Sequence, residues 1–315
     1  MQKVSVLGKV CYYKKGELRV WGVDDLKSGY GWLAYRAAVA FPPTLGADLW
    51  VFPPSDAQAI RDECKRRGII KSEGLLISLS AVDGTELPAG WVQSLEETFH
   101  ATILMVDHSG LSSKCPKYVG EFYPIPRTAF VKARQWQPPQ QKVIGTLLTY
   151  HTRKGIELLV SLMWSIFKKS PEVRFKVVAD FITASLLRNS VPPTVEILSG
   201  LSDEELVEFY LSLWAFLSLS MGEGGALPVA EAATLNVPII TPNHTAFSRL
   251  PASLRIGCVR QPAPIDAHLA GDIFIPNLKE VERIILENDT LPPPSEGDII
   301  VEDIDTILHN IATSL

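Results

Sequence analysis

Two glutamates that flank a Gly-Gly pair are the residues of this sequence best suited to chemistry. Glu223 precedes Gly224 and Gly225, and Glu231 follows Pro228 by about one turn of a helix. A carboxylate has two acceptor oxygens and can receive hydrogen bonds from both hydroxyls of a ribose or from those of a sugar. Glycines have no side chain, so a ligand can approach the backbone between the two acids. We therefore predict a site for a ligand that carries several hydroxyl groups.

The elements predicted around these glutamates place both acids at one edge of a sheet. The run AFLSLS (215–220) predicts a buried strand, and LPVAEAATLN (227–236) predicts a helix with Asn236 in the left-handed position past its end. In open parallel sheets, ligands bind beyond the carboxyl ends of the strands, near helix N-termini. The backbone N–H groups around Ala226 and Leu227 therefore suit an anion such as a diphosphate. Diphosphate, ribose and sugar together make a nucleotide-sugar.

The overall composition indicates a soluble, globular protein. The chain has 315 residues, which favours two domains, and it is 46% hydrophobic and 21% charged. The net charge of -5 provides no broad basic surface, so no nucleic-acid partner is expected. The 4 cysteines lack CxxC spacing and are interpreted as reduced thiols. With no signal peptide or transmembrane run, we expect a cytoplasmic protein and leave peripheral attachment to a membrane open. The oligomeric state is not predicted.

Alternating strand and helix patterns predict an α/β protein with parallel sheets. The polar, proline-containing segment QWQPPQQ (135–141) is interpreted as a linker. It gives an N-terminal domain over 1–137, a C-terminal domain over 138–297, and a final helix over 298–315 that we expect to cross back to the first domain. Residues 142–241 have strand–helix repeats of the doubly wound type. Strands of a smaller first sheet are predicted in VSVLGKV, LWVFP, GLLISLS and TILMVDH.

A run of acidic residues is assigned to a helix start rather than to catalysis. Ser202 is followed three positions later by Glu205, which is the spacing of a capping box. Asp203 and Glu204 lie in the same predicted first turn, where negative charge suits the helix dipole. They are therefore not candidates for the site.

The segment EGGALPVAE resembles the E-x7-E segment of retaining glycosyltransferases of the GT-B fold, especially family 4. The resemblance continues through AATLNVPIITPN and extends back over LSGLSDEELVEFYLSLWAFLSLS and VIGTLLTYHTRKGIELLV, so that it covers about residues 142–245. It implies two Rossmann-like domains facing a cleft, with the first domain abbreviated. It also implies transfer of a hexose from a nucleotide-diphosphate sugar with retention of configuration, without a metal or another cofactor.

The resemblance implies a role for each matching residue. Glu231 would bind the ribose hydroxyls and Glu223 the donor sugar, and Lys154 would neutralise the diphosphate. The remaining donor contacts would come from the segment Gly224, Gly225, Ala226 and Leu227, and from the backbone at Leu201 near the nucleobase.

One position departs from the family pattern. Thr146 replaces an arginine of the family, and we expect Arg153, next to Lys154, to supply the missing positive charge. The chemistry needs such charges because negative charge grows on the leaving phosphate, and removing one fixed donor typically slows such a reaction by about 10²–10³. We therefore predict that Glu223, Lys154 and Arg153 are catalytic and that Thr146 lies at the donor site.

The N-terminal half contains a second, weaker signal. Gly29-x-Gly31-x-x-Ala34 formally fits the dinucleotide fingerprint, which would indicate an NAD-dependent dehydrogenase. We disfavour this because the polar run DDLKS, rather than a strand, leads into it. Gly29 and Gly31 then form either a glycine-rich loop facing the donor across the cleft or a plain tight turn. His108, after TILMVD, is a candidate cleft residue, with a structural or exposed histidine as the alternative.

Two further hypotheses therefore accompany the glycosyltransferase. One is a glycosyltransferase-like protein that binds a nucleotide-sugar or carbohydrate with little or no catalysis, which Thr146 and the short first domain motivate. The other is the dehydrogenase. The sequence does not specify the base, the sugar, or whether the acceptor is a carbohydrate, lipid or protein.

Overall fold

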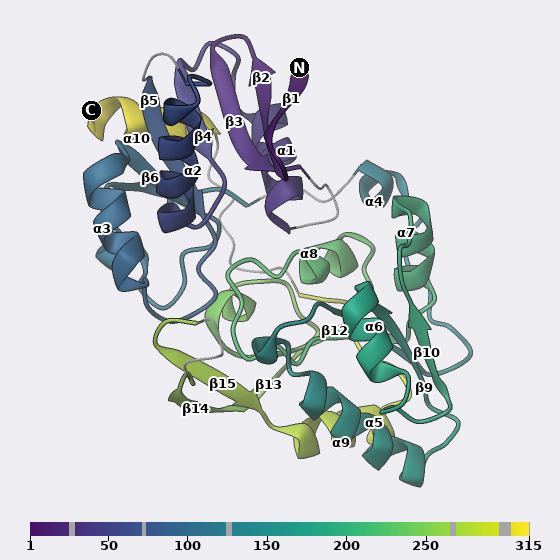
Figure 1. Ribbon diagram of the computed structural model, residues 1–315. Helices are drawn as coiled ribbons and strands as arrows, with labels where there is room; N and C mark the ends of the chain where they lie inside the picture. Colours follow the sequence, from purple (N-terminus) through teal and green to yellow (C-terminus); the bar gives the residue numbers. More distant parts are fainter. Residues whose placement is uncertain (25–28, 71–73, 124–127, 265–268, 296–303, 315) are drawn as a thin grey trace. The chain divides into compact units, whose positions relative to one another are not determined.

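The computed structural model describes residues 1–24, 29–70, 74–123, 128–264, 269–295 and 304–314, and its chain forms two compact units. Unit 1 consists of residues 1–125 and 299–315, and unit 2 of residues 126–298 (Figure 1). The division lies before the predicted linker, because that segment is docked on unit 2. Trp136 donates hydrogen bonds from its backbone N to Leu235 O at 2.9 Å and from Nε1 to Leu213 O at 2.6 Å.

Unit 1 contains a seven-stranded sheet in the order β1-β2-β3-β4-β5-β6-β7. The pairs from β1 to β3 are antiparallel, and those from β3 to β7 are parallel. The strands are β1 Gln2–Leu7, β2 Val10–Lys15, β3 Leu18–Val23, β4 Ala47–Trp50, β5 Leu75–Ser80, β6 Ala101–Leu104 and β7 Tyr118–Glu121.

The prediction of a smaller first sheet is therefore wrong. Two of the missed strands, β2 and β3, form a hairpin whose turn contains Gly16 at φ +62°, a left-handed conformation that glycine adopts without strain. Lys14 and Lys15 at its tip interrupt the apolar run, which hides the alternation of buried Cys11 and Tyr13 with less buried neighbours.

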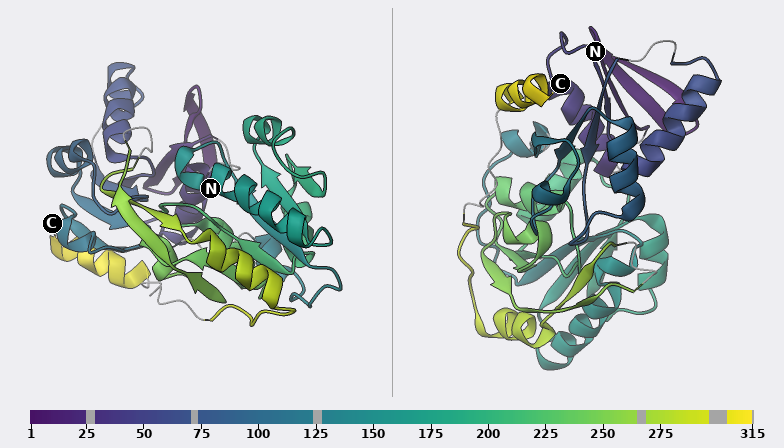
Figure 2. Two further views of the ribbon diagram at one scale, coloured as in Figure 1. Left: turned by 90° about the horizontal axis from the view of Figure 1, so that it is seen from below. Right: turned by 90° about the vertical axis from the view of Figure 1, so that its left-hand side faces the viewer.

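Helices pack on this sheet from several parts of the chain. Helices α2 and α3 pack against the face that carries Trp21 and Trp50, whose rings stack with centroids 4.6 Å apart. Helix α10, the yellow helix beside the C-terminus mark in Figure 2, packs against β7, where Asn310 Nδ2 donates to Val119 O at 2.9 Å. It thus belongs to unit 1, the domain to which we expect it to return. The helices are α1 Gly29–Ala40, α2 Pro54–Arg66, α3 Ala89–Thr98 and α10 Ile304–Ser314, with a 3₁₀ turn η1 at Ser112–Lys114.

Unit 2 contains a six-stranded parallel sheet in the order β10-β9-β8-β11-β12-β13. Counted within the unit, this order is 3-2-1-4-5-6, the usual order of a doubly wound fold. The chain reverses its direction of travel between β8 and β11, so the topological switch point lies between these strands. The strands are β8 Val143–Leu148, β9 Arg174–Ala179, β10 Val195–Leu198, β11 Ala215–Leu217, β12 Ile239–Pro242 and β13 Leu254–Ile256, with an antiparallel pair β14 Cys258–Pro262 and β15 Asp272–Pro276.

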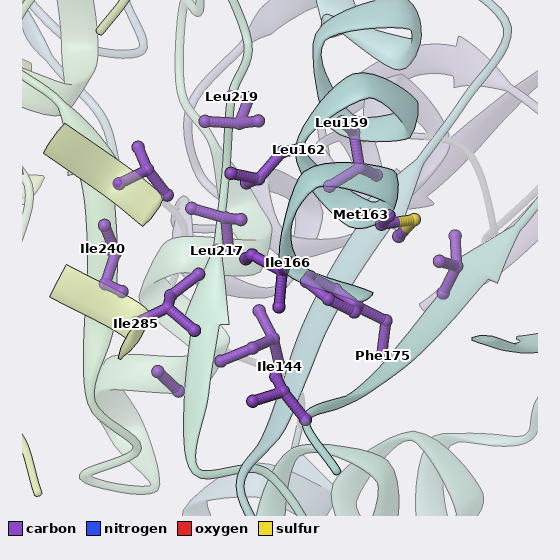
Figure 3. Packing of buried hydrophobic residues seen from close by; sticks show 14 of the residues in the cluster. Ile144, Leu159, Leu162, Met163, Ile166, Phe175, Leu217, Leu219, Ile240 and Ile285 are labelled. Carbon is purple, nitrogen blue, oxygen red and sulfur yellow. The ribbon is translucent and has the colours of Figure 1, made fainter. Parts of the chain in front are cut away.

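Both faces of the second sheet are covered. Helices α5 and α9 lie side by side and bury one face (Figures 1 and 2), where Ile144, Leu162 and Leu217 belong to one core cluster (Figure 3). Phe216 points to the other face, and its ring lies 5.3 Å from that of Tyr210 in α7. The helices are α4 Thr128–Lys132, α5 Ile156–Lys169, α6 Phe181–Leu187, α7 Asp203–Leu211, α8 Leu227–Thr234 and α9 Leu278–Glu287, with 3₁₀ turns η2 Thr152–Lys154 and η3 Thr245–Ser248.

The local predictions for unit 2 are confirmed. Ser202 and Glu205 form the capping box of α7. Asn236, past the end of α8, has φ +59°. Within the described residues, no helix is both long and apolar enough to cross a membrane.

Candidate active site at the switch point of unit 2

The loops that follow β8 and β11 meet beside the switch point. Met221 N donates to Arg153 O at 2.7 Å, and Ser220 Oγ donates to the same oxygen at 3.2 Å. Gly155 ends the η2 turn at φ +68°, and a Cβ on it would lie 2.5 Å from Leu219 O. Only glycine fits this close approach without strain. The sequence thereby fixes the turn that carries Arg153 and Lys154 against the loop that carries Glu223.

Glu223 is buried between two cations. Its side chain is 9% exposed, and Lys154 Nζ donates to Glu223 Oε1, while Arg153 Nη1 lies 3.5 Å from the same oxygen. Arg153 Nη1 also donates to Gly222 O at 3.0 Å. Burial alone would raise the pKa of the Glu223 carboxyl, but the charges of Lys154 and Arg153 hold it at about 2. The structure brings together all three residues that the sequence predicts to be catalytic.

Glu231 lies in α8 and is also buried, with 5% of its surface exposed. Tyr210 Oη lies 3.1 Å from Glu231 Oε2 and 3.2 Å from Pro228 O, so one phenolic proton serves two acceptors. Sequence analysis missed Tyr210, because a tyrosine in an apolar helix pattern looks like an ordinary core residue. The available signal was the hydroxyl of Tyr210, because a buried tyrosine hydroxyl needs a hydrogen-bond partner.

The segment between the two glutamates is compact. Gly224, Gly225 and Ala226 are buried. Ala226 precedes α8 in the left-handed region, at φ +41°, and has no polar side chain to cap the helix. Helix α8 then begins at Leu227, as predicted. The positive end of this helix, with a backbone that carries no bulky side chain, is suited to an anionic group.

Thr146 and Leu201 occupy different positions relative to this edge. Thr146 lies within β8, is 3% exposed and pairs in register with Val177. Leu201 lies between the end of β10 and the start of α7, on the carboxyl side of the sheet. Thr146 therefore does not take the place beyond the strand end that Arg153 and Lys154 occupy. The donor-binding roles of Thr146 and Leu201 stay predictions.

The candidates in unit 1 are placed as follows. Gly29 and Gly31 lie in the first turn of α1. Strand β3 ends at Val23, so a strand does precede this helix, which corrects the reason given above for disfavouring the dinucleotide fingerprint. Residues 25–28, between the strand and the helix, lie outside the described residues. His108 is 3% exposed, and its Nε2 lies 2.8 Å from Val82 O. This contact favours the structural interpretation of His108.

No group of three or more His, Cys, Asp or Glu side chains gathers to hold a metal ion among the residues that the structure describes.

Comparison with known proteins identifies the class of fold. A point mutant of S. aureus TarM, in complex with Fondaparinux, alpha-GlcNAc-glycerol and UDP, superposes with a TM-score of 0.54 at 12% identity, over 85% of this chain and 50% of that one. The pneumococcal O-GlcNAc transferase GtfA gives 0.50 at 13% identity over 85% and 53%. The lipopolysaccharide outer core galactosyltransferase WaaB gives 0.50 at 13% identity over 85% and 74%. The fold is thus the α/β fold of GT-B glycosyltransferases.

The family match narrows this class. Residues 130–267, which include the whole candidate site, match the family model described as Glycosyl transferases group 1. The matched segment lies within unit 2 and covers less than half of the chain. The chain spans about half the length of TarM and GtfA. A comparison with curated protein sequences finds no match.

Proposed function

We propose that the protein is a retaining glycosyltransferase that moves a hexose from a nucleoside-diphosphate sugar to a carbohydrate, lipid or protein acceptor, without a metal. The observation that supports it most is the cluster of Glu223 with Lys154 and Arg153 at the switch point. This cluster lies within the segment that matches the family model. Doubly wound folds bind their ligands at this place.

The cations would act on the leaving group. During transfer, the bond between the anomeric carbon of the sugar and the diphosphate oxygen breaks, and the bonding electrons go to the diphosphate. Lys154, Arg153 and the start of α8 would stabilise that charge while the acceptor oxygen bonds to the anomeric carbon on the face that the diphosphate leaves. The O–H bond of the acceptor would break in the same step, and its proton would pass to the leaving diphosphate. The single negative charge of Glu223 offsets one of the two positive charges, so Arg153 and Lys154 can stay partly buried, at 12% and 20% exposure, before the donor arrives.

The two glutamates would recognise the hydroxyls. Glu223, beside the cations, would accept hydrogen bonds from the sugar, and Glu231, one turn into α8, from the ribose. Tyr210 holds one oxygen of Glu231. A carboxylate oxygen can accept more than one hydrogen bond, so Glu231 would accept from a ribose diol in addition to its bond with Tyr210.

The first test is a thermal-shift panel of UDP-, GDP- and ADP-sugars, with NAD as the arm that tests the dehydrogenase. UDP-GlcNAc enters the panel because two structural neighbours, the TarM mutant and GtfA, are complexes with UDP and a GlcNAc compound. We expect one nucleotide-sugar to raise the melting temperature and NAD to leave it unchanged.

Variants then test the roles by release of nucleoside diphosphate. Lys154→Met should lower kcat by about 10²–10³, since it removes a charge aimed at the leaving group. Glu231→Gln should raise the Kd of the donor by about 10-fold, as expected for one charged hydrogen bond. Glu204→Gln removes an exposed acid of α7 and is the matched control. A Lys154→Met protein that turned over donor as fast as the wild type would refute the proposed mechanism.

The absence of the family arginine favours a second candidate, a donor-binding protein without transfer activity. Thr146 is buried in β8 and brings no charge to the site. This candidate predicts donor binding but no release of nucleoside diphosphate that depends on Glu223, so the same assay separates the two.

A further inference from the structure

The backbone of Glu223 is held by the turn that follows β12. Glu223 N donates to Thr245 Oγ1 at 3.1 Å, and Ala246 N donates to Glu223 O at 3.1 Å. Both polar groups of this one peptide position are thus bonded to a loop from the neighbouring strand. The Lys154 and Arg153 contacts hold only its carboxylate.

Thr245 has an unusual backbone conformation. Its φ is +39°, in the left-handed region, which a β-branched residue rarely adopts. Such strain persists only when surrounding contacts enforce it, and it concentrates at functional sites. Ser248 Oγ donates to Thr245 O at 2.7 Å, and Thr245 Oγ1 lies 3.0 Å from His244 Nδ1. The strained residue is therefore fixed on both its backbone and its side chain.

His244 completes the network. It is 3% exposed, and its ring stacks on Phe274 with centroids 4.7 Å apart and planes at 7°. Nε2 lies 3.0 Å from Ser220 O. A carbonyl oxygen only accepts, so Nε2 carries a proton, and in the neutral imidazole Nδ1 then accepts from the Thr245 hydroxyl. The Thr245 hydroxyl oxygen can then accept from Glu223 N–H, so every donor in this hydrogen-bonded network has one acceptor.

We propose that His244 and Thr245 are positioning residues that fix Glu223 for contact with the donor sugar. The proposal rests on the proposed function, because it concerns the residue assigned there to the sugar. A side chain misplaced by about 1 Å can reduce a rate by 10². Loss of the network should therefore affect recognition of the sugar and leave recognition of the nucleotide intact.

The experiment compares Thr245→Val, which removes the hydroxyl at nearly constant shape, with Thr245→Ser, which keeps it. Ser253→Ala is the matched control, since Ser253 Oγ also accepts a backbone N–H, that of Ile239 at 2.9 Å, at the opposite end of β12. The Kd values of UDP, GDP and ADP are measured beside those of their glucose, galactose, mannose and N-acetylglucosamine derivatives, together with kcat for nucleoside diphosphate release.

In Thr245→Val, we expect the nucleoside diphosphate to bind within about 2-fold of wild type, while the extra affinity given by the sugar disappears and kcat falls by about 10². Thr245→Ser should keep the extra affinity given by the sugar and kcat within about 5-fold of wild type, a smaller effect than the loss of one hydrogen bond would have. Ser253→Ala should melt at a lower temperature than wild type. It should keep the wild-type ratio of the Kd of the nucleoside diphosphate to the Kd of its sugar derivative.

Two results would overturn the proposal: unchanged sugar affinity and kcat in Thr245→Val, or an equal loss of both in Ser253→Ala. If Thr245→Val fails to fold, His244→Phe preserves an aromatic stack on Phe274, removes both ring-nitrogen contacts, and must show the same pattern. A wild-type protein that binds none of the nucleotide-sugars would instead refute the proposed function itself, and this proposal with it.

Discussion

The charge cluster around Glu223 predicts how stability depends on pH. The pKa of its carboxyl is lowered from the usual 4.5 to about 2. This difference corresponds to about 3 kcal/mol of folding free energy at neutral pH. Because the folded pKa is depressed, the contribution is complete above pH 5 and is lost as the pH falls through 4.5 toward 2. Linkage gives a loss of about 1 kcal/mol at pH 4 and about 2 kcal/mol at pH 3.

Glu223→Gln keeps the shape of the side chain and removes the charge. We expect the variant to be less stable than wild type by about 3 kcal/mol at pH 7, about 2 kcal/mol at pH 4 and about 1 kcal/mol at pH 3. Equilibrium urea unfolding at each pH, followed by the far-UV circular dichroism of the protein, measures this difference. Glu204→Gln, which removes an exposed carboxylate, is the control. A difference that stayed constant from pH 7 to pH 3 would show that Glu223 is not paired with Lys154 and Arg153 in solution.

Two substitutions in unit 2 give further predictions. Gly155→Ala should destabilise the protein by more than 2 kcal/mol, since the new Cβ would lie 2.5 Å from Leu219 O. Gly200 also has a positive φ, +72°, but a Cβ there meets nothing within 4 Å, so Gly200→Ala should destabilise the protein by about 1 kcal/mol. Equal melting temperatures for the two alanine variants would contradict this. Tyr210→Phe should destabilise the protein by about 1–2 kcal/mol and weaken binding of the nucleotide-sugar, because Glu231 loses one hydrogen-bond donor. An unchanged affinity for the nucleotide-sugar, measured by calorimetry, would show that Tyr210 does not orient Glu231.

The sequence was most informative where local rules agree with tertiary structure. The capping box at Ser202, the left-handed Asn236 and the helix start at Leu227 depend on neighbours within a few residues, and all are observed. Glu223 and Lys154 could be paired in advance only through the family resemblance, since 69 positions separate them.

Other features depend on contacts that no local pattern encodes. The linker prediction failed because proline-containing polar composition does not reveal that Trp136 binds two backbone carbonyls of unit 2. The contact of Thr245 with Glu223 joins loops 22 positions apart, and the strained φ of Thr245 violates local preference. Such violations are expected at functional sites, where other contacts enforce them.

The return of α10 to unit 1 has a consequence for folding during synthesis. Unit 2 is one continuous segment, whereas unit 1 combines residues 1–125 with 299–315. Ile307 and Ile311 of α10 are at most 2% exposed, so this helix supplies part of the core of unit 1. On the ribosome, the sheet of unit 1 is translated before α10, with all of unit 2 between them, so unit 2 can complete its core before unit 1 does.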